Sequence, residues 1–179
     1  MIQEIVGIFE KASKGFLQEQ KAFILSGVSE RSLCGELMKY LVEEISKTNF
    51  SKYHVDVEYN RNTGGKLKTV KNDKEVVIPI TCDIIVHSRG ENINQDNLIA
   101  VEMKKSSNSK AEKDKDRERM RALTKDSFDN IWSYDGKTLP EHVCRYQLGV
   151  YYEINLGKRF VKIEYYMKGE LQNNFHIKF

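Results

Sequence analysis

Hydrophobic positions recur with helical spacing over the first quarter of the chain. Apolar residues at a period near 3.6 predict a helix over residues 2–25, and the segment 26–28 interrupts it. Ser29 stands where a helix N-cap is expected, and an apolar stripe follows it. The stripe consists of Leu33, Leu37, Met38, Leu41, Val42 and Ile45. We therefore expect a second helix that packs one face against a core.

The middle and end of the chain show the alternation that is typical of strands. It predicts strands over residues 54–59, 76–88 and 98–105, with a basic, glycine-containing loop at 61–69. Ser109 and Glu112 have capping-box spacing, which predicts a highly charged helix that ends near Lys125. Two further strands, 145–154 and 158–167, should form an antiparallel hairpin around an Asn155–Gly157 turn.

This order of elements predicts a single α/β domain with a central sheet. The 179 residues suffice for one compact domain, and the 40% hydrophobic content with 2 prolines argues against extensive disorder. No apolar run approaches the roughly 20 residues that span a bilayer, and the N-terminal pattern is not that of a signal peptide. The three cysteines lie far apart, so they suggest neither a disulfide framework nor a zinc site. The composition thus indicates a cytoplasmic protein without a membrane partner.

Positive charge is concentrated in two segments, although the net charge is only +3. Residues 104–125 hold nine Lys and Arg against four Asp and Glu, and residues 60–74 hold five against one. Two basic segments on a mildly acidic remainder suggest a polyanion partner such as nucleic acid. Solvated basic surface is the alternative interpretation of the same segments.

Ionised side chains interrupt two of the apolar strands. Alternation places Leu98, Glu102 and Lys104 on one face of their strand. In the preceding strand, Asp83 points away from the apolar face that includes Cys82. If the two strands pair, Asp83, Glu102 and Lys104 converge at one end of the sheet. Two neighbouring carboxylates suit a hard divalent cation, and an ammonium beside them can orient a water or stabilise a phosphate.

This arrangement resembles the motif of the PD-(D/E)xK nuclease superfamily. Asp83 is followed, after 18 residues, by Glu102-Met103-Lys104, while Cys82 replaces the proline expected before the Asp. The resemblance covers roughly residues 29–154, and the predicted elements fit the αβββαβ core of that superfamily. It implies that Asp83 and Glu102 bind Mg²⁺ or Mn²⁺ and that Lys104 assists the attacking water. The implied activity is endonuclease-like hydrolysis of DNA phosphodiester bonds.

A second resemblance concerns the start of the second helix. Glu30-Arg31 is similar to the helix-borne Glu-Arg of the archaeal Holliday-junction-resolvase branch, which implies that Glu30 completes the metal site. The chain then divides into an N-terminal helical extension (1–28), a restriction-endonuclease-like core (29–154) and a C-terminal hairpin strand and tail (155–179). The expected architecture is a mixed sheet flanked by helices.

Several further side chains are candidates to bind nucleic acid, most simply DNA. They share a basic charge or a position near the expected site. They are Arg31, Arg61, Lys66, Lys68, Lys113, Arg117 and Gln147, and other basic residues of the charged helix, Arg119 among them, are phosphate candidates as well. A homodimer, or a place in a larger complex, would suit the cutting of two strands.

Two interpretations compete with a nuclease. The same fold can serve as a binding or protein-interaction module that does not cleave, in which case salt-sensitive DNA binding should survive Asp83→Ala. Alternatively, Glu102 and Lys104 simply pair with each other in a structural protein. Divalent cations should then leave the melting temperature unchanged, whereas a cluster of metal-binding carboxylates would be stabilised by them.

Overall fold

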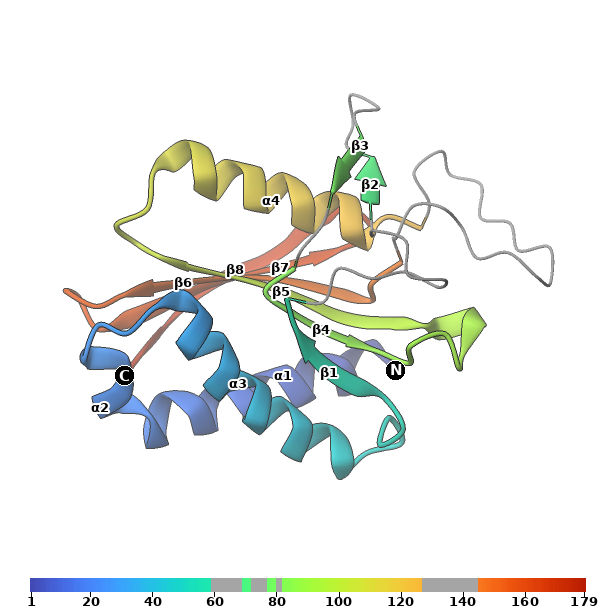
Figure 1. Cartoon of the computed structure of the whole chain (residues 1–179), viewed down its shortest axis with the longest axis horizontal. Coiled ribbons are helices and arrows are strands. Elements are labelled where there is room, and N and C mark those ends of the chain that lie inside the picture. Colours follow the sequence, from blue (N-terminus) through green and yellow to red (C-terminus); the bar gives the residue numbers. More distant parts are fainter. Residues whose placement is uncertain (59–68, 72–76, 80–81, 127–144) are drawn as a thin grey trace.

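A six-stranded mixed sheet forms the centre of the protein (Figure 1). The computed structural model describes residues 1–58, 69–71, 77–79, 82–126 and 145–179. The spatial order of the strands is β1-β4-β5-β6-β7-β8, with β5 and β6 parallel and the other neighbours antiparallel. Their bounds are β1 (His54–Val57), β4 (Ile84–His87), β5 (Asn97–Lys105), β6 (Leu148–Asn155), β7 (Phe160–Met167) and β8 (Glu170–Lys178). The expected α/β class and the expected pairing of β4 with β5 are confirmed.

Helices cover both faces of this sheet. One face carries α1 (Ile2–Glu19), α2 (Lys21–Leu25) and α3 (Glu30–Ser46), and the other carries α4 (Lys110–Thr124) (Figure 1). Because parallel neighbours require a crossover connection, α4 takes the chain from β5 back to the start of β6. In the described part of the chain, no helix has the length and apolar character needed to cross a bilayer.

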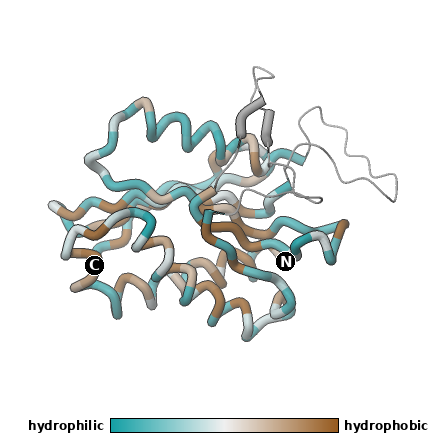
Figure 2. Tube along the Cα trace, in the orientation of Figure 1, coloured by the Kyte–Doolittle hydropathy of each residue, from teal (hydrophilic) through white to brown (hydrophobic). Residues whose placement is uncertain are grey.

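The two faces bury cores of different size. The larger core lies between the sheet and α1 and α3, and its side chains include Phe9, Phe16, Leu37, Val150 and Ile163. The smaller core lies under α4 and contains Cys82, Ile85, Ala100, Met120, Ala122, Leu123, Tyr146, Tyr151 and Tyr166. Figure 2 shows α4 as mainly hydrophilic, whereas hydrophobic and hydrophilic residues alternate along α1 and α3. The charged helix thus rests on a narrow apolar strip.

The predicted helices are confirmed with two corrections. The expected helix over residues 2–25 breaks at Gln20, whose backbone (φ −101°, ψ 17°) departs from helical geometry, so that α1 and α2 are separate. In α3, Val42 was expected in the apolar stripe, but it is 46% exposed. The buried stripe is therefore narrower than the pattern suggested. Ser29 caps α3 as expected, and Ser109 with Glu112 forms the predicted capping box of α4.

The predicted strand over residues 76–88 is wrong as a single element. Its first part, β3 (Val77–Pro79), pairs with β2 (Thr69–Lys71) in a separate two-stranded sheet, and β4 begins only at Ile84. A proline cannot donate to a ladder, which disfavours continuous pairing through this segment. The first strand also ends at Val57 rather than at residue 59, before Glu58 with its positive φ of 51°.

The C-terminal segment contains one strand more than the alternation suggested. A turn at Lys168 and Gly169, both with positive φ, reverses the chain after β7. The expected tail then continues as β8, an edge strand that pairs antiparallel with β7. Its polar outward residues had concealed the alternation.

Candidate active site

Strand β5 continues beyond the end of its neighbour β4. Their pairing stops at Ile84 opposite Val101, while β5 stays paired with β6 as far as Lys105. Within the described residues, those of β5 after Val101 therefore have a partner strand on one side only. Backbone groups on the other side need different partners, because an unpaired buried N–H costs about as much as a lost hydrogen bond.

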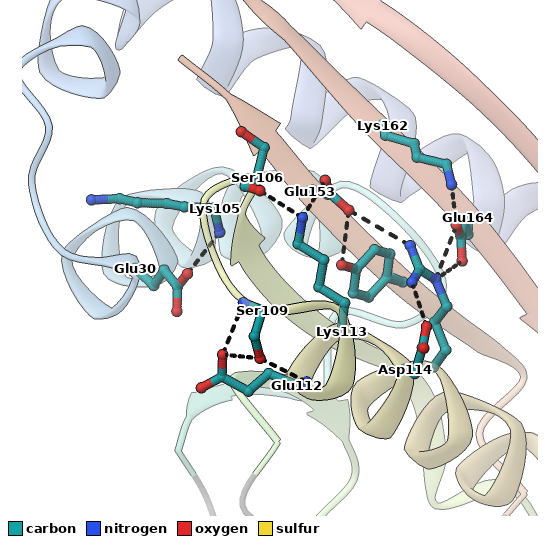
Figure 3. Close-up of polar contacts among 12 residues, drawn as sticks. Glu30, Lys105, Ser106, Ser109, Glu112, Lys113, Asp114, Glu153, Lys162 and Glu164 are labelled. Carbon is teal, nitrogen blue, oxygen red and sulfur yellow. Dashed lines mark hydrogen bonds and ion pairs between the residues drawn. The ribbon is translucent and has the colours of Figure 1, made fainter. Parts of the chain in front are cut away.

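Two carboxylates accept hydrogen bonds from the backbone of β5 beyond Val101. Asp83, directly before β4, accepts a hydrogen bond from the backbone N–H of Met103 through Oδ2 at 2.8 Å. Glu30, the first residue of α3, accepts from the N–H of Lys105 through Oε1 at 2.7 Å. Figure 3 shows how Glu30 reaches from its helix to the end of β5. Side chains from two different elements thus meet at this strand end.

Glu102, the residue of β5 directly before Met103, is almost completely enclosed. Only 1% of it is exposed, and its Oε1 accepts a hydrogen bond from Nη1 of Arg119 on α4 at 2.5 Å. Burial and then the neighbouring Asp83 carboxylate raise the pKa of Glu102 to about 8. Burial also raises the pKa of Asp83. The Asp83 carboxylate is therefore close enough to oppose ionisation of Glu102, whereas Glu102 acts to lower the pKa of Asp83.

Lys104 bridges the helices on the two sides of the sheet. Its Nζ lies 3.7 Å from Oε2 of Glu30 and 3.5 Å from Oδ2 of Asp116, which is on α4. Burial alone would lower the pKa of Lys104, but Asp116 and Asp83 outweigh it, so the pKa is raised. Lys104 therefore stays protonated. Its partners differ from the direct Glu102–Lys104 pair of the structural interpretation.

We call these six residues the strand-end cluster: Glu30, Asp83, Glu102, Lys104, Asp116 and Arg119. The cluster contains four carboxyl groups and two cations, which leaves two negative charges in excess when all are ionised. Oδ2 of Asp116 is buried and, among the described residues, lacks a hydrogen-bond partner, although Lys104 is near it. Burial raises the pKa of Asp116 in spite of this lysine. When all four carboxyl groups are ionised, the cluster is thus short of positive charge.

A divalent cation fits the chemistry of the cluster. Mg²⁺ and Mn²⁺ prefer carboxylate oxygens, and a dication would balance the excess charge beside Oδ2 of Asp116, which accepts no hydrogen bond from the described residues. The side chains are not already arranged around such an ion. Among the described residues, no three His, Cys, Asp or Glu side chains form a group that could hold a metal. Binding would therefore require Glu102 or Glu30 to exchange its present partner.

Two predictions about side-chain direction are corrected. Cys82 was expected on the face of Ile84, but it packs in the smaller core because it precedes the regular part of β4. Leu98 was expected on the face of Glu102, but it packs in the larger core. The register of β4 and β5 shifts beside it, between Val86 and His87, which interrupts the alternation. Glu102 itself contacts α4.

Lys113 points from α4 toward the sheet and is paired with an acid there (Figure 3). Arg117, on the same helix, is also paired with an acid of the sheet. Lys113 contacts Glu153 at 2.9 Å, and Arg117 contacts Glu164 at 2.9 Å. The Arg117 guanidinium also lies 4.3 Å from the centre of the Tyr151 ring. In the folded protein these two nucleic-acid candidates serve the attachment of α4 to the sheet.

The remaining predicted residues lie in different places. Arg31 is exposed and pairs with Glu58 at 3.1 Å. Gln147 precedes β6, near the level of Leu98, so it is at the opposite end of β5 from Lys104. The segments that contain Arg61, Lys66 and Lys68 are outside the described residues.

Sequence reasoning missed Asp116, and it named Arg119 only as one of the phosphate candidates on the charged helix. A signal existed. Asp116, Met120 and Leu123 follow one another at helical spacing, and Met120 and Leu123 are buried in the smaller core. An acidic residue that continues the apolar stripe of a charged helix should face the sheet, as the stripe does.

Comparisons of the chain with protein-family models, with curated proteins and with solved structures found no match. The strand-end cluster and the resemblance of its motif are therefore the basis on which a function is inferred.

Proposed function

We propose that this protein is a divalent-metal-dependent phosphodiesterase that acts on DNA, on a restriction-endonuclease-like core. One observation carries the proposal: four carboxyl groups and two cations gather where β5 extends past β4, with an excess of negative charge. The order of strands, the α4 crossover and the spacing of Asp83, Glu102 and Lys104 agree with it. A buried acidic excess is costly unless a cation compensates it.

Asp83 and Glu102 are the residues that would hold the cation, and Glu30 would complete the site through Oε2, since its Oε1 is held by the N–H of Lys105. A bound Mg²⁺ or Mn²⁺ supplies charge neutralisation at a phosphate and lowers the pKa of a coordinated water. Lys104 is protonated and lies beside the same carboxylates. It therefore orients the water and stabilises charge on the phosphate by donating hydrogen bonds, rather than by accepting a proton.

Metal binding is tested by thermal melting. We expect millimolar Mn²⁺ or Mg²⁺ to raise the melting temperature of the wild-type protein, because a ligand that binds only the folded state stabilises it by mass action. Asp83→Asn should abolish most of this increase. An identical melting temperature with and without the metals would favour the structural interpretation of the cluster.

Cleavage is tested with two adjacent lysines. Lys104→Ala should reduce Mn²⁺-dependent cleavage of plasmid, linear or branched DNA by about a hundredfold, the typical loss for one charge-stabilising donor. Lys105→Ala is the matched control, because its Nζ donates to the carbonyl of Gly27 and away from the cluster, and it should stay near wild-type activity. Equal activity of Lys104→Ala and wild type would remove Lys104 from the site.

A non-cleaving protein on the same fold is the second candidate. Asp83 and Glu30 already satisfy backbone groups of β5, which is a structural role that requires no metal. In that case the protein would bind DNA, or a protein partner, without Mn²⁺-dependent products.

A further inference from the structure

Arg119 occupies the position of a counter-cation to Glu102. Its Nη1 lies 2.5 Å from Oε1 of Glu102 and 3.4 Å from Oδ1 of Asp116. The Arg119 side chain is 24% exposed, whereas Glu102 is almost fully buried. The Arg119 side chain is therefore in contact both with an enclosed carboxylate and with solvent.

This pairing differs from that of the other cations on the inner side of α4. Lys113 and Arg117 are held by Glu153 and Glu164, which belong to the attachment of the helix. Arg119 instead pairs with a residue that the proposed function assigns to the metal. A divalent cation and a guanidinium repel each other strongly at neighbouring positions in a partly buried site. They therefore compete for the same carboxylate oxygen.

A guanidinium released from Glu102 would remain at the strand end, because α4 fixes its backbone there. The planar fork of donors of a guanidinium matches two oxygens of a phosphate, and the Arg119 side chain is already partly exposed to solvent. The chemistry of the released group is thus suited to the substrate of the proposed reaction, a phosphodiester.

We propose that Arg119 is a displaceable counter-cation: it holds Glu102 in the metal-free protein and is transferred to a backbone phosphate of the nucleic acid when a divalent cation takes over that carboxylate. This inference rests on the proposed function. It adds a substrate-positioning residue outside the Asp–Glu–Lys motif, and it makes metal and nucleic acid bind cooperatively. Each ligand strengthens the other by the same factor, as linkage requires.

The first test is Mn²⁺ affinity, measured by titration calorimetry on the full chain. Arg119→Met should bind Mn²⁺ about tenfold more tightly than wild type, because the competitor for Glu102 is gone. Arg121→Met removes the same charge two residues further along α4, from a side chain that contacts Gly169 and the Tyr166 ring. This control should stay within about twofold of wild type. If Arg119→Met does not fold, Arg119→Gln replaces it.

The second test measures cooperativity directly. A short phosphorothioate duplex, which resists hydrolysis, is titrated with and without Mn²⁺ and followed by fluorescence anisotropy. Mn²⁺ should strengthen duplex binding by wild type and by Arg121→Met to the same extent, and by Arg119→Met at least about threefold less. Circular dichroism confirms that the variants are folded.

The outcomes separate this inference from the proposed function. Absence of Mn²⁺ binding by wild type as well as Arg119→Met contradicts the proposed function. Mn²⁺ binding by wild type that Arg119→Met leaves unchanged or weakens shows Arg119 to be a fixed structural partner and overturns the inference. Tighter Mn²⁺ binding with unchanged cooperativity overturns the transfer of Arg119 to phosphate.

Discussion

Glu102 is a carboxyl group whose surroundings oppose its ionisation. It is buried, it lies beside Asp83, and Arg119 offsets only part of the cost, so its pKa is raised from 4.5 to about 8. Ionisation of Glu102 therefore costs folding free energy, because the folded protein compensates the buried charge only in part. A site that binds a cation can recover that free energy on binding. The residue thus connects stability with the proposed function.

The pH dependence of stability provides a test at this residue. Between its unfolded and folded pKa values, Glu102 binds more protons in the folded state, so the free energy of unfolding should fall as the pH rises from 5 to 8. Glu102→Gln, which resembles the protonated form, should flatten this decrease by roughly 1 to 3 kcal/mol. Urea unfolding in EDTA at several pH values measures it. A decrease of equal size in wild type and Glu102→Gln would show that ionisation of Glu102 costs the folded state no free energy.

Single residues were predictable where regular alternation reaches them. Glu102 and Lys104 are on one face of β5, as alternation predicted, and both contact α4. Asp83 precedes the regular part of β4 and comes near them because β4 and β5 pair as antiparallel neighbours. Alternation did not reveal the partners of Glu102 and Lys104, since Arg119 and Asp116 come from α4 and depend on how that helix is rotated over the sheet. The rotation of α4 is decided by side-chain packing, which cannot be deduced from the order of the elements.

Charged and aromatic groups, in addition to the narrow apolar strip, attach helix α4 to the sheet. Glu164, which is 3% exposed, receives contacts from Arg117, from Lys162 at 2.6 Å and from the hydroxyl of Tyr166 at 2.6 Å. Burial opposes ionisation of Glu164, but Arg117 and Lys162 outweigh it and lower its pKa. The helix therefore depends on paired charges as much as on its narrow apolar strip.

We expect Arg117→Met to destabilise the protein by about 1 to 3 kcal/mol, because it leaves the buried Glu164 with one cation fewer. Lys115→Met is the control in the same helix, since Lys115 is exposed, and it should change the free energy of unfolding by less than about 0.5 kcal/mol. Chemical denaturation gives both values. Equal stability of the two variants would mean that the Arg117–Glu164 pair contributes nothing net.

At the scale of elements, local sequence signals predicted the starts of two helices reliably, but they predicted poorly where strands are interrupted or added. Ser29 and Ser109 marked the starts of α3 and α4 correctly, because a cap is decided by neighbouring residues. The separation of β3 from β4 and the existence of β8 depend on which strands find partners. Alternation cannot show this for short or polar segments.

The molecule as a whole places the strand-end cluster between two cores of unequal size. The larger core fixes the sheet against α1 and α3, and the smaller one fixes α4, which carries Asp116 and Arg119. Damage to either core lowers stability, but the geometry of the cluster should depend on the smaller core in particular. Stability and metal affinity are therefore expected to separate.

This separation can be tested with two side-chain truncations of equal size. Met120→Ala removes three heavy atoms from the smaller core, one residue from Arg119, and Ile163→Ala removes three from the larger core, on a strand that carries no residue of the cluster. Each should cost about 2 to 5 kcal/mol of stability. Mn²⁺ affinity, measured well below both melting temperatures, should fall severalfold in Met120→Ala and stay near wild type in Ile163→Ala. Equal losses of affinity in both variants would show that the cluster responds to global stability alone, and that α4 holds no separate control over the site.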